Sequence, residues 1–218
     1  LRKISPTLWE VGVHIADVAH YVREGSPTDR EAQNRGTSIY LVDRTIPMLP
    51  EKLSNNICSL RPNEEKLCFA AVFEMNDEAE ILNEWIGKTV IKSARRYAYE
   101  EVQTVIEGGE GDYKEEILVL HGLASKLRSM RMKAGSINFH SEEVKFILDE
   151  TGKPIDTYVK VQQESHMLIE DFMLLANRTV AERIGKPLGR KKIKTFVYRI
   201  HDEPNPEKLN TFLQFIGK

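Results

Sequence analysis

The order of hydrophobic and polar residues predicts several β-strands with one apolar face. Residues 8–22 begin with strict alternation, which predicts a long strand with one buried face. The apolar positions of that face are Trp9, Val11, Val13 and Ile15. Residues 67–75 and 81–91 are predicted to pair as an antiparallel hairpin, because the turn Asn76-Asp77-Glu78 separates two apolar runs. Shorter strands are predicted at residues 37–42, 144–148, 155–160 and 195–201.

Other segments carry the spacing and the end signals of helices. A helix is predicted over residues 27–35, with Ser26 as N-cap, Pro27 as its first residue and Gly36 as C-cap. Apolar residues near helical spacing predict a long amphipathic helix over residues 114–132. Further helices are predicted at residues 51–56, 100–106, 162–184 and 206–216. Strands with interspersed helices, many of them in hairpins, indicate an α+β domain.

The composition is that of an ordinary soluble globular domain. With 218 residues, 41% apolar and 29% charged, one domain is expected. The formal net charge of −2 lacks a basic excess, so it argues weakly against RNA and leaves that role to local basic stripes. Cys58 and Cys68 lie in no CxxC or Cys/His motif, which leaves zinc unsupported and fits a reducing cytosol. No apolar run reaches membrane-span length and no signal peptide begins the chain, so a cytoplasmic protein without a membrane partner is expected.

A polar stripe runs along the helix predicted at residues 162–184. This helix is apolar over much of its surface and should be largely buried, yet His166, Glu170 and Asn177 fall within roughly 40° of one another. A buried carboxylate without a partner is unfavourable, so the stripe needs partners. It is either a solvent-facing stripe, a partner of an internal arginine, or the lining of a polar cavity.

Two further sets of residues have candidate chemistry. His14, Asp17 and His20 are possible metal ligands of an unrelated hydrolase, but Asp17 points away from the histidines on a strand. Ordinary strand residues are therefore the favoured interpretation of this trio. Lys92, Arg95 and Arg96 form one basic group, and residues 186–194 (KPLGRKKIK) form a second. The second group is the better candidate for contacts with phosphates, and a solvated loop is the alternative.

Long segments of the chain resemble one enzyme family. Residues 34–62 (NRGTSIYLVDRTIPMLPEKLSNNICSLRP) resemble the RNB catalytic domain of the ribonuclease II and ribonuclease R exoribonucleases, and most of all bacterial ribonuclease R. The segments VGVHIADVAHYV, KFIL, IEDFMLLAN and FVYRIHDEP extend the resemblance over essentially the whole chain. The resemblance implies a twisted, mostly antiparallel sheet curled toward a barrel, surrounded by helices. It also implies that residues 1–218 are an internal part of a single RNB catalytic domain, truncated at both ends, without the flanking cold-shock and S1 domains.

The resemblance further implies an activity for the parent protein. Family members are processive 3′→5′ exoribonucleases that hydrolyse single-stranded RNA to nucleoside 5′-monophosphates with Mg²⁺. The family's aspartate cluster, D-x5-D-x-D-D, is expected upstream of Leu1, and its arginine, in an S-P-I-R-K/R-Y motif, downstream of Lys218. No catalytic or metal-binding residue is therefore expected in this chain, which should be inactive alone. The alternative is a catalytically inactive RNB-like protein that binds RNA or another partner.

Four residues match positions that contact RNA in this family. The resemblance implies that Tyr40 and Phe139 clamp the last bases of single-stranded RNA. Stacking suits that task because it accepts any base and contributes about 1–3 kcal/mol per base. Tyr99 and Glu170 match a tyrosine and a glutamate associated with the choice of RNA over DNA, which requires a donor and an acceptor near the 2′-hydroxyl.

Overall fold

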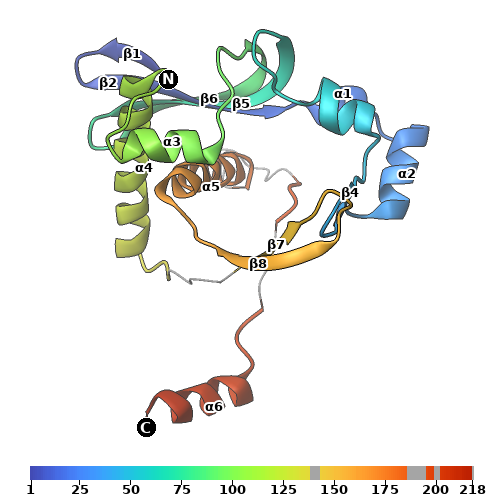
Figure 1. Ribbon diagram of the computed structural model, residues 1–218. Coiled ribbons are helices and arrows are strands. Elements are labelled where there is room, and N and C mark those ends of the chain that lie inside the picture. Colours follow the sequence, from blue (N-terminus) through green and yellow to red (C-terminus); the bar gives the residue numbers. More distant parts are fainter. Residues whose placement is uncertain (138–142, 186–194, 199–201, 218) are drawn as a thin grey trace. The chain divides into compact units, whose positions relative to one another are not determined.

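The computed structural model describes residues 1–137, 143–185, 195–198 and 202–217 (Figure 1). The chain divides into two compact units, Leu1–Asn177 and Arg178–Lys218. Every strand of the described residues belongs to the first unit. The sheets therefore lie within the first unit.

The largest sheet of the first unit has four antiparallel strands in the order β1-β2-β5-β6 (Figure 1). They are β1 (Arg2–Ser5), β2 (Leu8–Ala16), β5 (Glu65–Asn76) and β6 (Ile81–Lys92). The predicted hairpin is confirmed, because β5 and β6 pair along their length. Its turn is held by the Asn76 side chain, whose oxygen accepts hydrogen bonds from the backbone N–H groups of Glu78 and Glu80.

The first predicted strand is correct only in part. Val11 is buried in the core and Trp9 and Val13 pack against it, so the alternating face is confirmed there, but Ile15 is exposed. The strand ends at Ala16, and the helix α1 (Val18–Tyr21) follows instead of the extended chain predicted to residue 22. The alternation stops at this point, and the Asp17 carboxylate turns to Lys88 Nζ on β6, 2.9 Å away.

The signals at the ends of the next helix are confirmed. Helix α2 (Pro27–Arg35) begins after Ser26, whose side chain accepts a hydrogen bond from the Asp29 backbone N–H at 3.2 Å. It ends at Gly36, which has a φ of 69°, a value that glycine adopts without steric cost. Local capping chemistry therefore determines both ends of this helix.

Residues 37–57 contain less regular structure than predicted. The strand expected at residues 37–42 is only β3 (Ile39–Tyr40), paired with β4 (Thr45–Ile46), because the chain reverses direction directly after Tyr40. The Leu41 N–H donates to the Arg44 carbonyl across this reversal. A π-helical segment, η1 (Lys52–Ile57), stands where a short helix was predicted.

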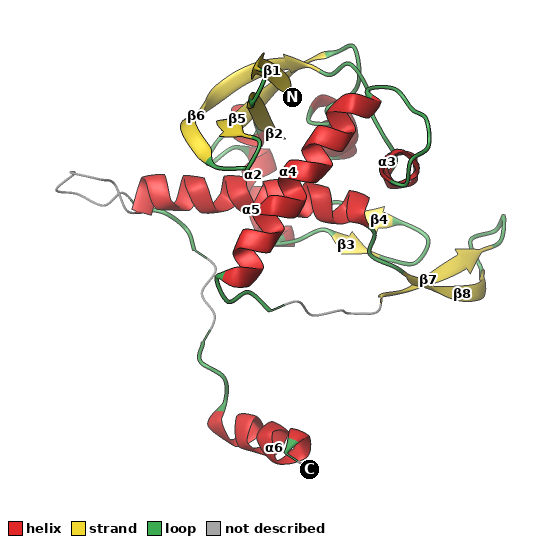
Figure 2. Ribbon diagram, turned by 90° about the vertical axis from the view of Figure 1, so that its left-hand side faces the viewer, coloured by secondary structure: helices red, strands yellow, loops and turns green. Residues whose placement is uncertain are grey.

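The core of the first unit lies between the large sheet and two helices, α4 (Lys114–Lys133) and α5 (Glu164–Gly185), which cross in Figure 2. Its residues come from β2, β5, α4, α5 and the turn between β5 and β6, and include Val11, Phe73, Met75, Leu123, Leu168, Phe172 and Ala176. The last three recur every four residues, so they share one face of α5. The expectation that this helix is largely buried holds only for that face, since Ile169 and Leu174 are exposed.

The two strands predicted at residues 144–148 and 155–160 are confirmed, and they form a second hairpin. Strands β7 (Glu143–Leu148) and β8 (Pro154–Lys160) pair in antiparallel fashion. The Asp149 side chain closes their turn by accepting hydrogen bonds from the backbone N–H groups of Thr151 and Lys153. The sequence predicted the strands and a turn-rich linker between them, and the structure shows that the strands pair.

The sheets of the described residues remain open, which corrects the expectation of a sheet curled toward a barrel. They form three separate antiparallel sheets, β1-β2-β5-β6, β3-β4 and β7-β8 (Figure 1). Closure of a sheet requires its two edge strands to pair. Here β1 pairs only with β2, and β6 pairs along its length only with β5. The α+β class with antiparallel sheets is confirmed, and the curled barrel is not.

The second unit contains the end of α5 and one further helix. Helix α6 (Pro206–Ile216) is confirmed, and Asn205 caps it by accepting from the backbone N–H groups of Glu207 and Lys208. The strand predicted at residues 195–201 is wrong for residues 195–198, which pair with no strand of the described chain. Residues 199–201 lie outside the described part.

Candidate functional site

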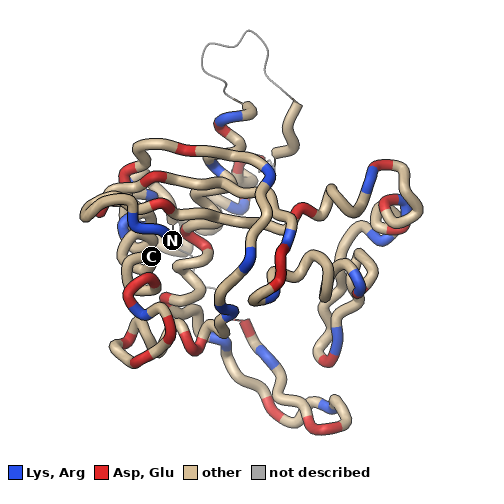
Figure 3. Tube along the Cα trace, turned by 90° about the horizontal axis from the view of Figure 1, so that it is seen from above, with Lys and Arg blue, Asp and Glu red and all other residues tan. Residues whose placement is uncertain are grey.

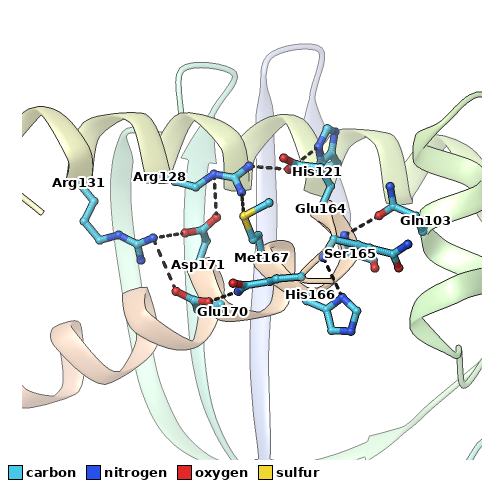
Figure 4. Close-up of polar contacts among 12 residues, drawn as sticks. Gln103, His121, Arg128, Arg131, Glu164, Ser165, His166, Met167, Glu170 and Asp171 are labelled. Atoms are coloured by element: carbon cyan, nitrogen blue, oxygen red, sulfur yellow. Dashed lines mark hydrogen bonds and ion pairs between the residues drawn. The ribbon is translucent and has the colours of Figure 1, made fainter. Parts of the chain in front are cut away.

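Ion pairs join the first turns of α5 to α4 (Figure 4). The Glu164 carboxylate accepts from Arg128 Nη2 at 2.6 Å and lies 3.2 Å from His121 Nε2. Two turns further along α5, Asp171 Oδ1 lies 2.8 Å from Arg131 Nη2. Arg128 and Arg131 are three residues apart and therefore project from the same side of α4. Together they contact three carboxylates of α5, those of Glu164, Glu170 and Asp171.

Asp171 is the most deeply buried acid of this cluster. Its side chain is 1% exposed, and Oδ2 has no hydrogen-bond partner among the described residues, with Arg128 Nε 3.8 Å away. Burial raises the pKa of Asp171, although the positive charges of Arg131 and Arg128 oppose the shift. The ion pairs of Asp171 therefore link α5 to α4. Burying this carboxylate away from water carries a considerable desolvation cost.

Glu170, the neighbour of Asp171, faces outward. Its side chain is 49% exposed, with Oε1 3.9 Å from Arg131 Nη2. Its other oxygen, Oε2, accepts from Gln162 Nε2 at 2.9 Å. The predicted polar stripe is exposed at Glu170 and Asn177 and half-buried at His166. Glu170 thus combines two of the interpretations left open by the sequence, an outward-facing position and an arginine partner.

Tyr99 lies against the same face of α5. It begins helix α3 (Tyr99–Ile106), and its ring stacks on His166 with centroids 4.1 Å apart and planes at 15°. His166 Nδ1 accepts from the backbone N–H of Gln163, and burial, followed by the charge of Lys160, lowers the pKa of His166. The imidazole is therefore neutral near pH 7. His166 is one helical turn before Glu170, so the structure brings Tyr99 to the helix face that carries Glu170.

Of the two aromatic residues expected to clamp RNA, the structure describes Tyr40. Tyr40 ends β3 with 79% of its surface exposed, next to the exposed Leu41 and Val42. An aromatic ring so exposed contributes little to a core and is available for stacking. Phe139 lies outside the described residues, as do residues 186–194 of the second basic group.

The proposed metal trio does not assemble. His14 Nδ1 lies 3.5 Å from the Thr89 hydroxyl, and Asp17 pairs with Lys88. In the part of the chain that the structure describes, no group of three His, Cys, Asp or Glu residues could hold a metal ion. The described residues therefore offer no cluster of carboxylates that fits Mg²⁺.

Charges and hydropathy add two observations. Acidic and basic residues are interspersed along the described chain (Figure 3), so attraction to phosphates has to come from particular residues. Among the described helices, none has the length and apolar character needed to cross a membrane.

Sequence reasoning missed Arg128, Arg131 and the contact of His166 with Tyr99. The spacing of Arg128 and Arg131 on α4 is a signal that could have matched them with the acids of α5. The stacking partner of Tyr99 had no such signal, because 66 residues lie between Tyr99 and His166 in the sequence.

This arrangement defines an α+β domain with antiparallel sheets, helices on one face of the large sheet, and an exposed aromatic and acidic face where α3 meets α5. The RNB domain family matches residues 1–218, and the chain belongs to this family. The expected family membership is thereby confirmed.

Named relatives and a solved structure agree with this assignment. Ribonuclease R 1 of Lactococcus lactis is 40% identical over 98% of this chain and 26% of its own length. DIS3-like exonuclease 2 of Schizosaccharomyces pombe is 41% identical over 99% of this chain and 24% of its own length. The structure of Mycoplasma genitalium RNase R in complex with double-stranded RNA has a TM-score of 0.88 and 30% identity, covering 99% of this chain and 38% of that one. The chain thus spans about a quarter of the length of these curated relatives.

Proposed function

We propose that the protein is a processive 3′→5′ exoribonuclease that degrades single-stranded RNA to nucleoside 5′-monophosphates in the cytoplasm. The observation that carries the proposal is the exposed face where Tyr99 stacks on His166 one turn from Glu170. It lies in a chain of the RNB family, whose named relatives are ribonucleases and exonucleases.

In this proposal the described residues bind and select RNA. The exposed ring of Tyr40 stacks on a base, which requires no particular sequence. The Tyr99 hydroxyl supplies a donor, and the Glu170 carboxylate an acceptor, near the sugar. A carboxylate can accept the hydrogen bond of a 2′-hydroxyl, which DNA lacks, so these two residues favour RNA. Phe139 is proposed as the second stacking residue.

Hydrolysis is assigned to other parts of the protein. The chain is proposed to be an internal part of the RNB catalytic domain. Its sequence contains neither the aspartate motif nor the arginine motif of the family. Mg²⁺ is accordingly proposed to bind elsewhere in the protein, and this chain alone is expected to be inactive.

The full-length protein tests the activity directly. A labelled single-stranded RNA and the DNA of the same sequence are each incubated with Mg²⁺ or with EDTA. We expect mononucleotides to appear only from RNA and only with Mg²⁺. RNA binding without product release would overturn the proposed hydrolysis and favour an RNA-binding protein without activity.

Replacing Tyr40 by alanine should weaken RNA binding. The loss of one stacking contact, about 1–3 kcal/mol, corresponds to roughly 5- to 150-fold in Kd. Fluorescence anisotropy with a labelled single-stranded RNA in EDTA measures this change without turnover. Tyr40→Phe is the matched control because it keeps the ring. If Tyr40→Ala binds as tightly as Tyr40→Phe, Tyr40 does not stack on a base.

A further inference from the structure

One guanidinium contacts both adjacent acids of α5. Arg131 Nη2 lies 2.8 Å from Asp171 Oδ1 and 3.9 Å from Glu170 Oε1 (Figure 4). Asp171 is buried with its side chain 1% exposed, whereas Glu170 keeps about half of its surface. The buried carboxylate therefore anchors the arginine, and the exposed carboxylate meets a guanidinium that is already fixed in place.

The anchoring of Arg131 by Asp171 lowers the ordering cost of the exposed ion pair between Arg131 and Glu170. An isolated surface ion pair contributes little, because two long side chains have to be ordered together. Here Asp171 has already ordered Arg131, so only the Glu170 side chain remains to be positioned. Gln162 Nε2 fixes the other side by donating to Glu170 Oε2 at 2.9 Å. Each oxygen of Glu170 thus faces one donor group.

The two contacts leave acceptor capacity on the carboxylate. At 3.9 Å the Arg131 contact is an ion pair and not a hydrogen bond, so Oε1 can still accept from a hydroxyl group. Arg128, three residues earlier on α4, is anchored in a similar way by Glu164 and lies 3.8 Å from Asp171. No contact of Arg128 with Glu170 is found in the described residues. Arg128 is therefore a matched control for Arg131.

We propose that Arg131 is a positioning residue, which Asp171 anchors and which aims the Glu170 carboxylate at the ribose 2′-hydroxyl of bound RNA. The inference rests on the proposed function, since it assigns the orientation of Glu170 to a second residue. It predicts a specific signature. A general loss of positive charge would weaken RNA and DNA binding alike, whereas loss of positioning weakens the binding of RNA only.

The experiment compares RNA with DNA of the same sequence on the full-length protein. Binding of both oligonucleotides is measured by anisotropy in EDTA for wild type, Glu170→Gln, Arg131→Met and Arg128→Met. We expect Arg131→Met to lower the ratio of RNA to DNA affinity by about three- to tenfold, the size of one hydrogen bond. Arg128→Met should leave this ratio unchanged. Arg131→Met added to Glu170→Gln should change the ratio no further.

A double variant and the Tm of each protein separate an effect on positioning from a loss of folding. Arg131→Met leaves Asp171 without its nearest partner, so the double variant Arg131→Met/Asp171→Asn removes both charges, and Tm is followed for each protein. The double variant should show the same lowered ratio of RNA to DNA affinity as Arg131→Met. If Glu170→Gln lowers the ratio but neither Arg131 variant does, the positioning role is wrong and the proposed function stands. If wild type does not prefer RNA, or Glu170→Gln has no effect, the selectivity assigned to Glu170 itself is overturned.

Discussion

Replacing Phe73 by alanine should lower the free energy of unfolding by about 3–5 kcal/mol, the usual cost of removing a buried aromatic side chain. Phe73 is 0% exposed and lies in the cluster formed by the sheet, α4 and α5. It is opposite Val11 on β2 and Glu84 on β6, so the surrounding strands are held in register and cannot close the cavity freely. Urea unfolding of the chain followed by circular dichroism measures the loss.

The same strand provides a matched control for this change. Phe69 lies four residues earlier on β5 and is 42% exposed. Phe69→Ala removes the same atoms but leaves no comparable cavity, so it should destabilise the protein much less. Equal losses for Phe69→Ala and Phe73→Ala would contradict the position of the core between the sheet and the two helices.

Asp171→Ala is expected to destabilise the chain by about 3 kcal/mol, the lower end of the range for breaking a buried ion pair. The substitution leaves Arg131 and Arg128 without the carboxylate that lies between α4 and α5. The lower end applies because Arg128 keeps its contact with Glu164, and because the side chains of Arg131 and Arg128 are 30% and 20% exposed, so water partly solvates them. Asp171→Asn should cost less, because its amide oxygen can still accept from Arg131. Urea unfolding of the three proteins tests this order, which an equal loss for both variants would refute.

The difference in unfolding free energy between wild type and Asp171→Asn should also depend on pH. Burial raises the pKa of Asp171, so the folded state holds the proton more tightly than the unfolded state does. The contribution of this carboxyl group to stability is therefore complete below its unfolded pKa, about 3.9, and is lost as pH rises through the folded pKa. As the pH falls from about 7 to about 4, we expect the free energy of unfolding of wild type to rise relative to that of Asp171→Asn. If this difference in unfolding free energy stays constant with pH, the pKa of Asp171 is not raised.

Several elements were predictable because their signals are local. Alternation and a polar turn predict the hairpin of β5 and β6, and Ser26, Pro27 and Gly36 mark the ends of α2. Helical periodicity identifies α4 and the apolar face of α5. The motifs around Tyr40 and Glu170 were sufficient to identify the family. For the hairpin and the helices, the deciding interactions lie within a few residues of one another, so the order of residues contains the necessary information.

Other features depend on which elements meet in space. The sequence predicts a polar stripe on α5 but not that Arg131 on α4 would contact it, nor that Tyr99 would stack on His166. Asp17, directly after β2, pairs with Lys88 of another strand, and the sheet stays open because its edge strands do not pair. Periodicity shows which side chains share a face, whereas the partner of that face is decided by packing between distant segments. The sequence by itself therefore determined the family and the faces of the helices, and only the tertiary structure decided which charges and rings meet around Glu170.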